Sequence, residues 1–163
     1  MTISPERLCA GLWRHPGYCI ALGFGAGCAP WAPGTWGTLA GMPLCWLLQS
    51  LPLGYYLLAV ILAFMLGVWA CGQTGQALGV HDHPSMVWDE MVGYCLAMTA
   101  APAGWLWLLL GFGLFRLFDI LKPWPVCWAD RRLGGGFGAM ADDALAGIYA
   151  GLALQGLALV YPP

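Results

Sequence analysis

Residues 53–72 read LGYYLLAVILAFMLGVWACG, without a charged side chain and without a proline. A transmembrane helix needs about 20 consecutive apolar residues to cross the hydrocarbon core of a bilayer. This stretch has that length and composition, so the sequence predicts a membrane-spanning helix here. The remaining segments must then be interpreted as parts of a protein whose solvent is largely lipid.

The composition of the whole chain agrees with a membrane protein. Of its 163 residues, 60% are hydrophobic and 9% are charged, whereas about 25% charged residues are usual in soluble domains. No formally charged side chain occurs between Pro16 and Val80. An ordinary cytosolic domain is therefore excluded, and the length indicates a single membrane-embedded domain over residues 1–163. The net charge of −2, without a long basic patch, argues against a nucleic-acid partner.

Helix breakers divide the rest of the chain into further elements. Glycines and prolines in residues 17–37 predict a short N-terminal helix followed by a structured loop. The sequence AAPAG at 100–104 predicts a hairpin turn rather than a kink. The predicted apolar helices cover residues 39–49, 53–72, 91–99, 105–115 and 143–160. The predicted fold class is therefore an all-α integral-membrane bundle of about five apolar helices plus a short N-terminal helix.

Charges gather on one side of this predicted bundle. If each apolar helix crosses once, the N-terminal segment and the loops 73–88 and 119–142 lie on the same side of the membrane. All six Lys and Arg residues are in the N-terminal segment or close to the second loop. Because basic residues favour the cytoplasmic side, we expect a multi-pass protein with a polar site at the cytoplasmic helix ends.

The acidic residues point to a metal site. Glu6 is the only acid outside the segment from Asp82 to Asp143. Carboxylates within apolar helix sequence are costly unless they are paired, and they mark functional sites in membrane proteins. Acids that converge from several helix ends repel one another, and a hard divalent cation such as Mg²⁺ relieves that repulsion. Asp130, by contrast, is interpreted as a solvated loop residue.

Basic side chains lie close to these acids in the sequence. Arg116, Lys122 and Arg131 place cations beside carboxylates, which is typical of a phosphate site next to a metal ion. The spacing of Arg116 and Asp119 also fits a simple intrahelical salt bridge. The glycines at 134–138 predict a loop whose backbone N–H groups approach an anion. His81 and His83 form an H-x-H pair, but their spacing does not match a closed zinc site.

Cysteines and small residues carry weaker signals. The seven cysteines contain no C-x-x-C pair and predict neither a disulfide framework nor a zinc knuckle. Gly37-x-x-x-Gly41 and Gly147-x-x-x-Gly151 predict close helix packing. An alternative interpretation of Gly147, Gly151 and Gly93 is a lateral entrance for lipid between helices.

Four ordered blocks resemble the motifs of the phosphatidylglycerophosphatase A family. They are APGTWGT at 32–38, HDHPSMVWDE at 81–90, FRLFDILKPWP at 115–125 and GGFGAMADDALAG at 135–147. The resemblance spans about residues 17–155. It implies an all-helical phosphatase of the bacterial inner membrane that uses Mg²⁺ to hydrolyse phosphatidylglycerophosphate, a phospholipid substrate of the inner leaflet.

Together with the charge pattern, the resemblance implies roles for individual residues. The expected metal ligands are Asp89, Glu90, Asp119, Asp142 and Asp143. The expected catalytic residues are Asp119, Lys122, Arg116, Asp142 and Thr35. The expected substrate-binding residues are Arg131, Thr38 and His81.

Two other functional classes stay open at this point. One is a small membrane transporter or channel for anions or divalent cations, although acids on one face only argue against a path through the bilayer. The other is a non-catalytic membrane subunit. For a phosphatase, metal-bound water and an aspartyl-phosphate on Asp119 or Asp142 are both open routes. The number of metal ions and the oligomeric state are also open.

Overall fold

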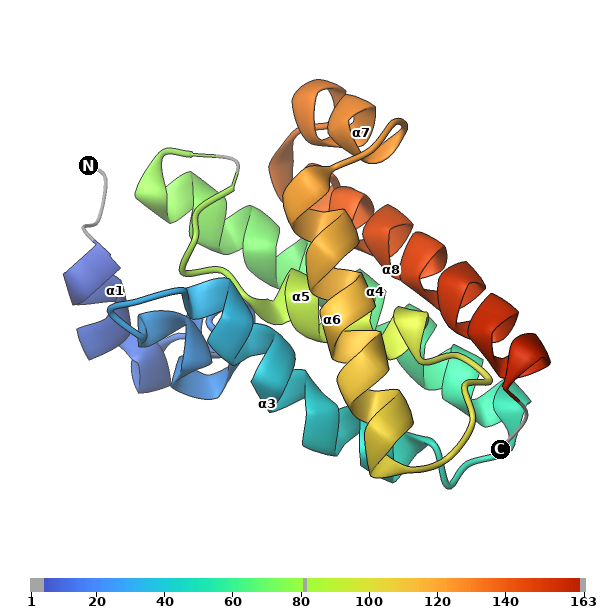
Figure 1. Ribbon diagram of the computed structural model, residues 1–163. Coiled ribbons are helices and arrows are strands. Elements are labelled where there is room, and N and C mark those ends of the chain that lie inside the picture. Colours follow the sequence, from blue (N-terminus) through green and yellow to red (C-terminus); the bar gives the residue numbers. More distant parts are fainter. Residues whose placement is uncertain (1–4, 81, 162–163) are drawn as a thin grey trace.

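The computed structural model describes residues 5–80 and 82–161, and all regular elements in these ranges are helical (Figure 1). The prediction of an all-α chain is thus confirmed for the described residues. The elements in chain order are α1 (Pro5–Ala10), η1 (Leu12–Arg14), α2 (Pro16–Ala21), η2 (Gly23–Cys28), α3 (Pro33–Leu48), α4 (Leu53–Leu78), α5 (Trp88–Ala97), α6 (Trp105–Leu121), α7 (Val126–Arg132) and α8 (Gly135–Val160).

Two helices are long and apolar enough to cross a membrane. They are α4 and α8, each of 26 residues. Only 22% and 28% of their most apolar segments is buried inside the protein. A core helix of a soluble protein would be mostly buried, so the exposed apolar faces of α4 and α8 suit contact with lipid.

Helix α5 lies at the centre of the bundle. It contacts α3, α4, α6 and α8, and of its ten residues only Glu90 and Leu96 are not buried. At 1.5 Å per residue it is about 15 Å long, which is too short to cross a bilayer. Other helices rather than lipid therefore cover this element, and its first turn carries Asp89 and Glu90 into the interior.

The predicted close packing of small residues is confirmed between α5 and α8. A Cβ atom at Gly147 would overlap the carbonyl oxygen of Gly93, and one at Gly93 would lie 2.7 Å from the carbonyl oxygen of Asp143. The two backbones touch here. The alternative interpretation of these glycines as a lateral lipid entrance is therefore wrong, because side chains and lipid have no space between the helices.

The start of the last helix differs from the prediction. We expected it at Asp143, but α8 begins at Gly135 and includes most of the glycine run. A Cβ at Gly136 would overlap the carbonyl oxygen of Val68 in α4, so tight packing compensates for the low helix propensity of glycine. Asp142 therefore lies inside a helix, and Gly136 packs against α4 where an anion-binding loop was predicted.

Other local expectations have mixed outcomes. Helix α5 ends at Ala97 and α6 begins at Trp105, which confirms the hairpin turn. Helix α7 forms inside the segment that was predicted as a loop. A disulfide joins Cys9 of α1 to Cys28 of η2, so the prediction of no disulfide is wrong for this pair. The spacing of cysteines along the chain does not reveal which of them meet in space.

Candidate active site

An acidic pocket of about 110 Å³ lies where α5, α6 and α8 meet. Its acids come from the loop before α5, the first turn of α5, the last turn of α6 and the interior of α8. The loop before α5 covers part of it. The pocket is lined by Asp82, His83, Pro84, Met86, Asp89, Glu90, Asp119, Lys122, Ala139, Asp142 and Asp143.

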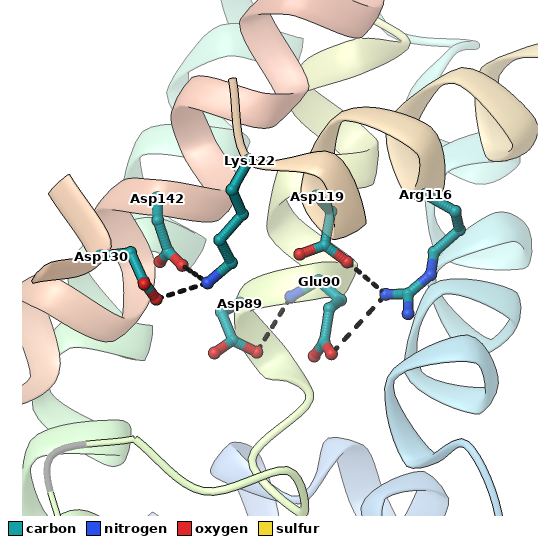
Figure 2. Close-up of polar contacts among 7 residues, drawn as sticks. All are labelled: Asp89, Glu90, Arg116, Asp119, Lys122, Asp130 and Asp142. Carbon is teal, nitrogen blue, oxygen red and sulfur yellow. Dashed lines mark hydrogen bonds and ion pairs between the residues drawn. The ribbon is translucent and has the colours of Figure 1, made fainter. Parts of the chain in front are cut away.

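Three carboxylates lie close enough to share a cation. Asp89, Glu90 and Asp143 each place an oxygen within 4.8 Å of the others. Asp89 and Asp143 are buried, and the Asp89 carboxylate accepts the backbone N–H of Glu90 at 3.0 Å (Figure 2). Glu90 Oε2 is buried and has no hydrogen-bond partner among the described residues. A buried oxygen with an unused lone pair suits a hard cation as its partner.

Burial also changes the proton affinity of the carboxyl groups that α5 carries. Desolvation, followed by repulsion from Asp143, raises the pKa of Glu90 to about 8. Desolvation and the charge of Glu90 raise the pKa of Asp89 as well. The pocket thus disfavours uncompensated negative charge, and a bound cation removes that penalty.

Arg116 connects α5 to α6 through two acids. Its Nη1 donates to Asp119 Oδ2 at 2.6 Å and lies 3.8 Å from Glu90 Oε1 (Figure 2). The predicted pair of Arg116 and Asp119 is confirmed, and the contact with Glu90 is additional. The first turn of α3 packs against Glu90 and Arg116, because a Cβ at Gly34 would overlap Glu90 Oε1 and lie 3.2 Å from Arg116 Nη1. Arg116 therefore orients two carboxylates of the pocket wall.

Lys122 connects α6 to α7 and α8. It caps α6 in a left-handed conformation with φ 43°, which few non-glycine residues adopt. Its Nζ donates to Asp142 Oδ2 at 2.8 Å and to Asp130 Oδ1 (Figure 2). Burial opposes the charge, but hydrogen bonds to Asp130 and Asp142 raise the pKa of Lys122 above its usual range. The interpretation of Asp130 as a solvated loop residue is wrong, because it pairs with this lysine.

The other predicted residues lie farther from the pocket. Thr38 is buried and donates its hydroxyl to the carbonyl of Gly34 at 2.9 Å within α3. Thr35 is half-buried in the same helix, and Arg131 is exposed near the end of α7. None of Thr35, Thr38 and Arg131 lines the pocket, so their roles toward substrate stay predictions. His81 lies outside the described residues.

Two pocket residues were not predicted to belong to the site. Asp82 and His83 line the pocket from the loop before α5. His83 Nδ1 accepts the N–H of Ser85 at 3.1 Å, which shapes this loop. Signals for both were present in the sequence, because Asp82 opens the acidic segment and His83 belongs to the H-x-H pair. Both also share a sequence block with Asp89 and Glu90.

Comparison with known proteins agrees with this geometry. The model of the family described as Phosphatidylglycerophosphatase A matches residues 19–158. The chain belongs to the phosphatidylglycerophosphatase A family. A Phosphatidylglycerophosphatase A of Escherichia coli (strain K12) is 45% identical over 153 residues, which cover 91% of this chain and 89% of the relative. One of Haemophilus influenzae is 50% identical over 139 residues, 83% of this chain and 85% of the relative. No solved structure matches the chain.

The four blocks that resemble the motifs of the phosphatidylglycerophosphatase A family meet in space. Gly34 from the first block touches Glu90 from the second, and Glu90 pairs with Arg116 from the third. Asp143 from the fourth block lies close to Glu90. The four blocks thus converge on one pocket. The family match and the two relatives named Phosphatidylglycerophosphatase A support the enzyme interpretation over the transporter and the non-catalytic subunit.

Proposed function

We propose that this chain uses the acidic pocket to hydrolyse phosphatidylglycerophosphate to phosphatidylglycerol and inorganic phosphate. Water supplies an oxygen to phosphorus, the bond from phosphorus to the glycerol oxygen breaks, and a proton from that water passes to the glycerol oxygen, which leaves as the alcohol. The observation that carries this proposal is the convergence of buried carboxylates with Arg116 and Lys122 in a family of lipid phosphatases.

We assign Mg²⁺ to the carboxylates of Asp89, Glu90 and Asp143, with Asp119 and Asp142 beside them in the wall. The support is the oxygen-only donor set and the buried Glu90 Oε2 without a hydrogen-bond partner among the described residues. When bound, the ion neutralises phosphate oxygens and polarises the phosphorus centre. The chain itself then has to position the phosphate and neutralise its remaining charge.

Of the Lys and Arg side chains in the described part of the chain, Lys122 lines the pocket, and we assign it to the phosphate of the substrate. Uncatalysed hydrolysis of phosphate monoesters is among the slowest reactions known, so preorganised charge must supply much of the reduction in the barrier. Arg116 does not line the pocket. We therefore assign to it the orientation of Asp119 and Glu90.

We propose that several helices cross the bacterial inner membrane and that the pocket faces the cytoplasm. Trp124 and Trp128 are exposed, one just before α7 and one within it, and Trp46 and Trp105 are exposed near the end of α3 and at the start of α6. Helix α7 lies at one end of the bundle, and the end of α3 and the start of α6 lie at the other (Figure 1). Exposed tryptophans at two levels are typical of the two membrane interfaces, and basic residues favour the cytoplasmic side. In this orientation, the headgroup of an inner-leaflet lipid lies at the level of the pocket.

Phosphate release by the purified protein in detergent tests the function. With phosphatidylglycerophosphate and Mg²⁺ we expect release, and with EDTA we expect none. A variant with Asp89→Asn and Glu90→Gln serves as the inactive control, since its side chains keep their shape but lose their charge. No release in either condition contradicts the proposed hydrolysis. Equal release in both conditions contradicts only the assignment of Mg²⁺.

A further inference from the structure

Helix α7 presents two different sides. Val126 and Ala129 are buried against the protein, at 1% and 0% exposure. Trp128 and Arg132 are exposed on the other side. Asp130 lies between these sides, and its half-buried carboxylate points toward Lys122 (Figure 2). A residue of a solvated loop would not be directed toward Lys122 in this way.

Lys122 is held by two carboxylates that differ in their access to the pocket. Asp142 is 6% exposed and lines the pocket, as Lys122 does. Asp130 is 34% exposed and does not line it. Asp130 therefore contacts the ammonium group from outside the space that a phosphate would enter.

The second carboxylate, that of Asp130, restricts the position of the Lys122 ammonium group. A lysine side chain is flexible, and its compact charge is attracted to any nearby acid. Held by Asp142 alone, the ammonium group would be free to pivot about a single contact. Asp130 supplies a second contact from a different helix, so the position of Nζ becomes determined by α7 and α8 together.

We propose that Asp130 is a positioning residue of the hydrolysis reaction, which fixes Lys122 Nζ at the pocket wall without touching the substrate. This inference rests on the proposed function. It requires that the contribution of Asp130 to turnover passes through Lys122. It also requires that the lysine becomes more mobile when Asp130 loses its charge.

A double-mutant cycle tests the first requirement. The variants are Asp130→Asn, Lys122→Met and the combination of both, and Arg132→Gln is the matched control on the same helix. We expect Asp130→Asn to lower kcat about 10-fold with little change in KM, by comparison with the loss of one preorganised donor. In the Lys122→Met background the same change should have no further effect. Asp130→Glu should restore part of kcat.

Amine labelling tests the second requirement independently of activity. Lys122 is the only lysine in the sequence, so mass spectrometry of reductively methylated protein reports on this side chain and the N-terminus alone. We expect Asp130→Asn to increase the labelling rate of Lys122 several-fold and Arg132→Gln to leave it unchanged. Thermal unfolding of each variant monitors the fold.

Three outcomes would overturn the inference. The first is a loss in Asp130→Asn that multiplies with the loss in Lys122→Met. The second is an unchanged labelling rate in Asp130→Asn. The third is a fully active Asp130→Asn variant. A wild-type protein that releases no phosphate would instead contradict the proposed function, so the two failures are distinguishable.

Discussion

Arg116 and Lys122 each bridge two carboxylates, but they do so in different surroundings. The side chains of Arg116, Glu90 and Asp119 are 18%, 14% and 13% exposed. Lys122 and Asp130 are 29% and 34% exposed, and only Asp142 on that side is deeply buried. One basic residue is therefore enclosed by α3, α5 and α6, whereas the other borders the open part of the pocket.

This difference separates two tasks. The enclosed guanidinium has fixed partners on regular helices, so it suits the orientation of the carboxylates beside the proposed cation site. The more accessible ammonium group follows the end of α6 and lines the pocket. It suits direct contact with an anionic substrate. The predictions below test this division, beginning with the largest expected effect.

Asp119→Asn removes a negative charge from the enclosed surroundings of Arg116. We expect the fold to persist, because the side chain keeps its shape. We expect turnover to fall about 1,000-fold or more, because a negative charge beside the proposed cation site is lost and Arg116 loses one ionic partner. Phosphate release as a function of Mg²⁺ concentration measures this. The division of tasks fails if Asp119→Asn retains full activity while Asp130→Asn abolishes it.

Lys122→Ala removes the more accessible ammonium group, which lines the pocket. We expect a cost of about 2–4 kcal/mol in transition-state stabilisation, with kcat and kcat/KM reduced together. Steady-state kinetics with phosphatidylglycerophosphate give both constants. An unchanged kcat with a raised KM would restrict Lys122 to binding of the ground state and contradict its catalytic assignment.

Gly34→Ala adds a methyl group to α3 where this helix contacts Glu90 and Arg116. The new Cβ would overlap Glu90 Oε1 and lie 3.2 Å from Arg116 Nη1, so we expect both side chains to shift and kcat to fall about 10-fold. Gly113→Ala in α6 is the matched control, because a Cβ there meets nothing within 4 Å. Equal activity of the two variants would show that the position of Glu90 tolerates displacement.

Arg131→Gln has the smallest expected effect. Arg131 is exposed and does not line the pocket, so a contact with the substrate headgroup would be weak and screened by salt. We expect KM to rise about threefold at low salt with unchanged kcat. Arg132→Gln should change neither constant. A large decrease in kcat for Arg131→Gln would instead place this side chain at the reacting phosphate.

Several parts of the site were predictable because their signals are local. Asp89 and Glu90 stand together at the start of an apolar segment, and Arg116 and Asp119 have helical spacing. Asp130 was misinterpreted because α7 was not recognised as a helix that turns this residue toward Lys122. The contact of Gly34 with Glu90 was equally hidden, since no pattern in either segment reports the distance between α3 and α5.

The sequence by itself indicated a membrane-associated protein, its helical class and its family. A continuous apolar run of about 20 residues favours a helix in lipid, because a helix satisfies its backbone hydrogen bonds within the segment. The motif blocks can be recognised directly from their order in the sequence. Only the tertiary structure showed which acids lie close enough to share a cation and which acids hold a basic side chain. These contacts depend on the enclosure of α5 by the surrounding helices and on the start of α8 at Gly135. Both follow from close backbone packing between distant segments, which no local propensity specifies.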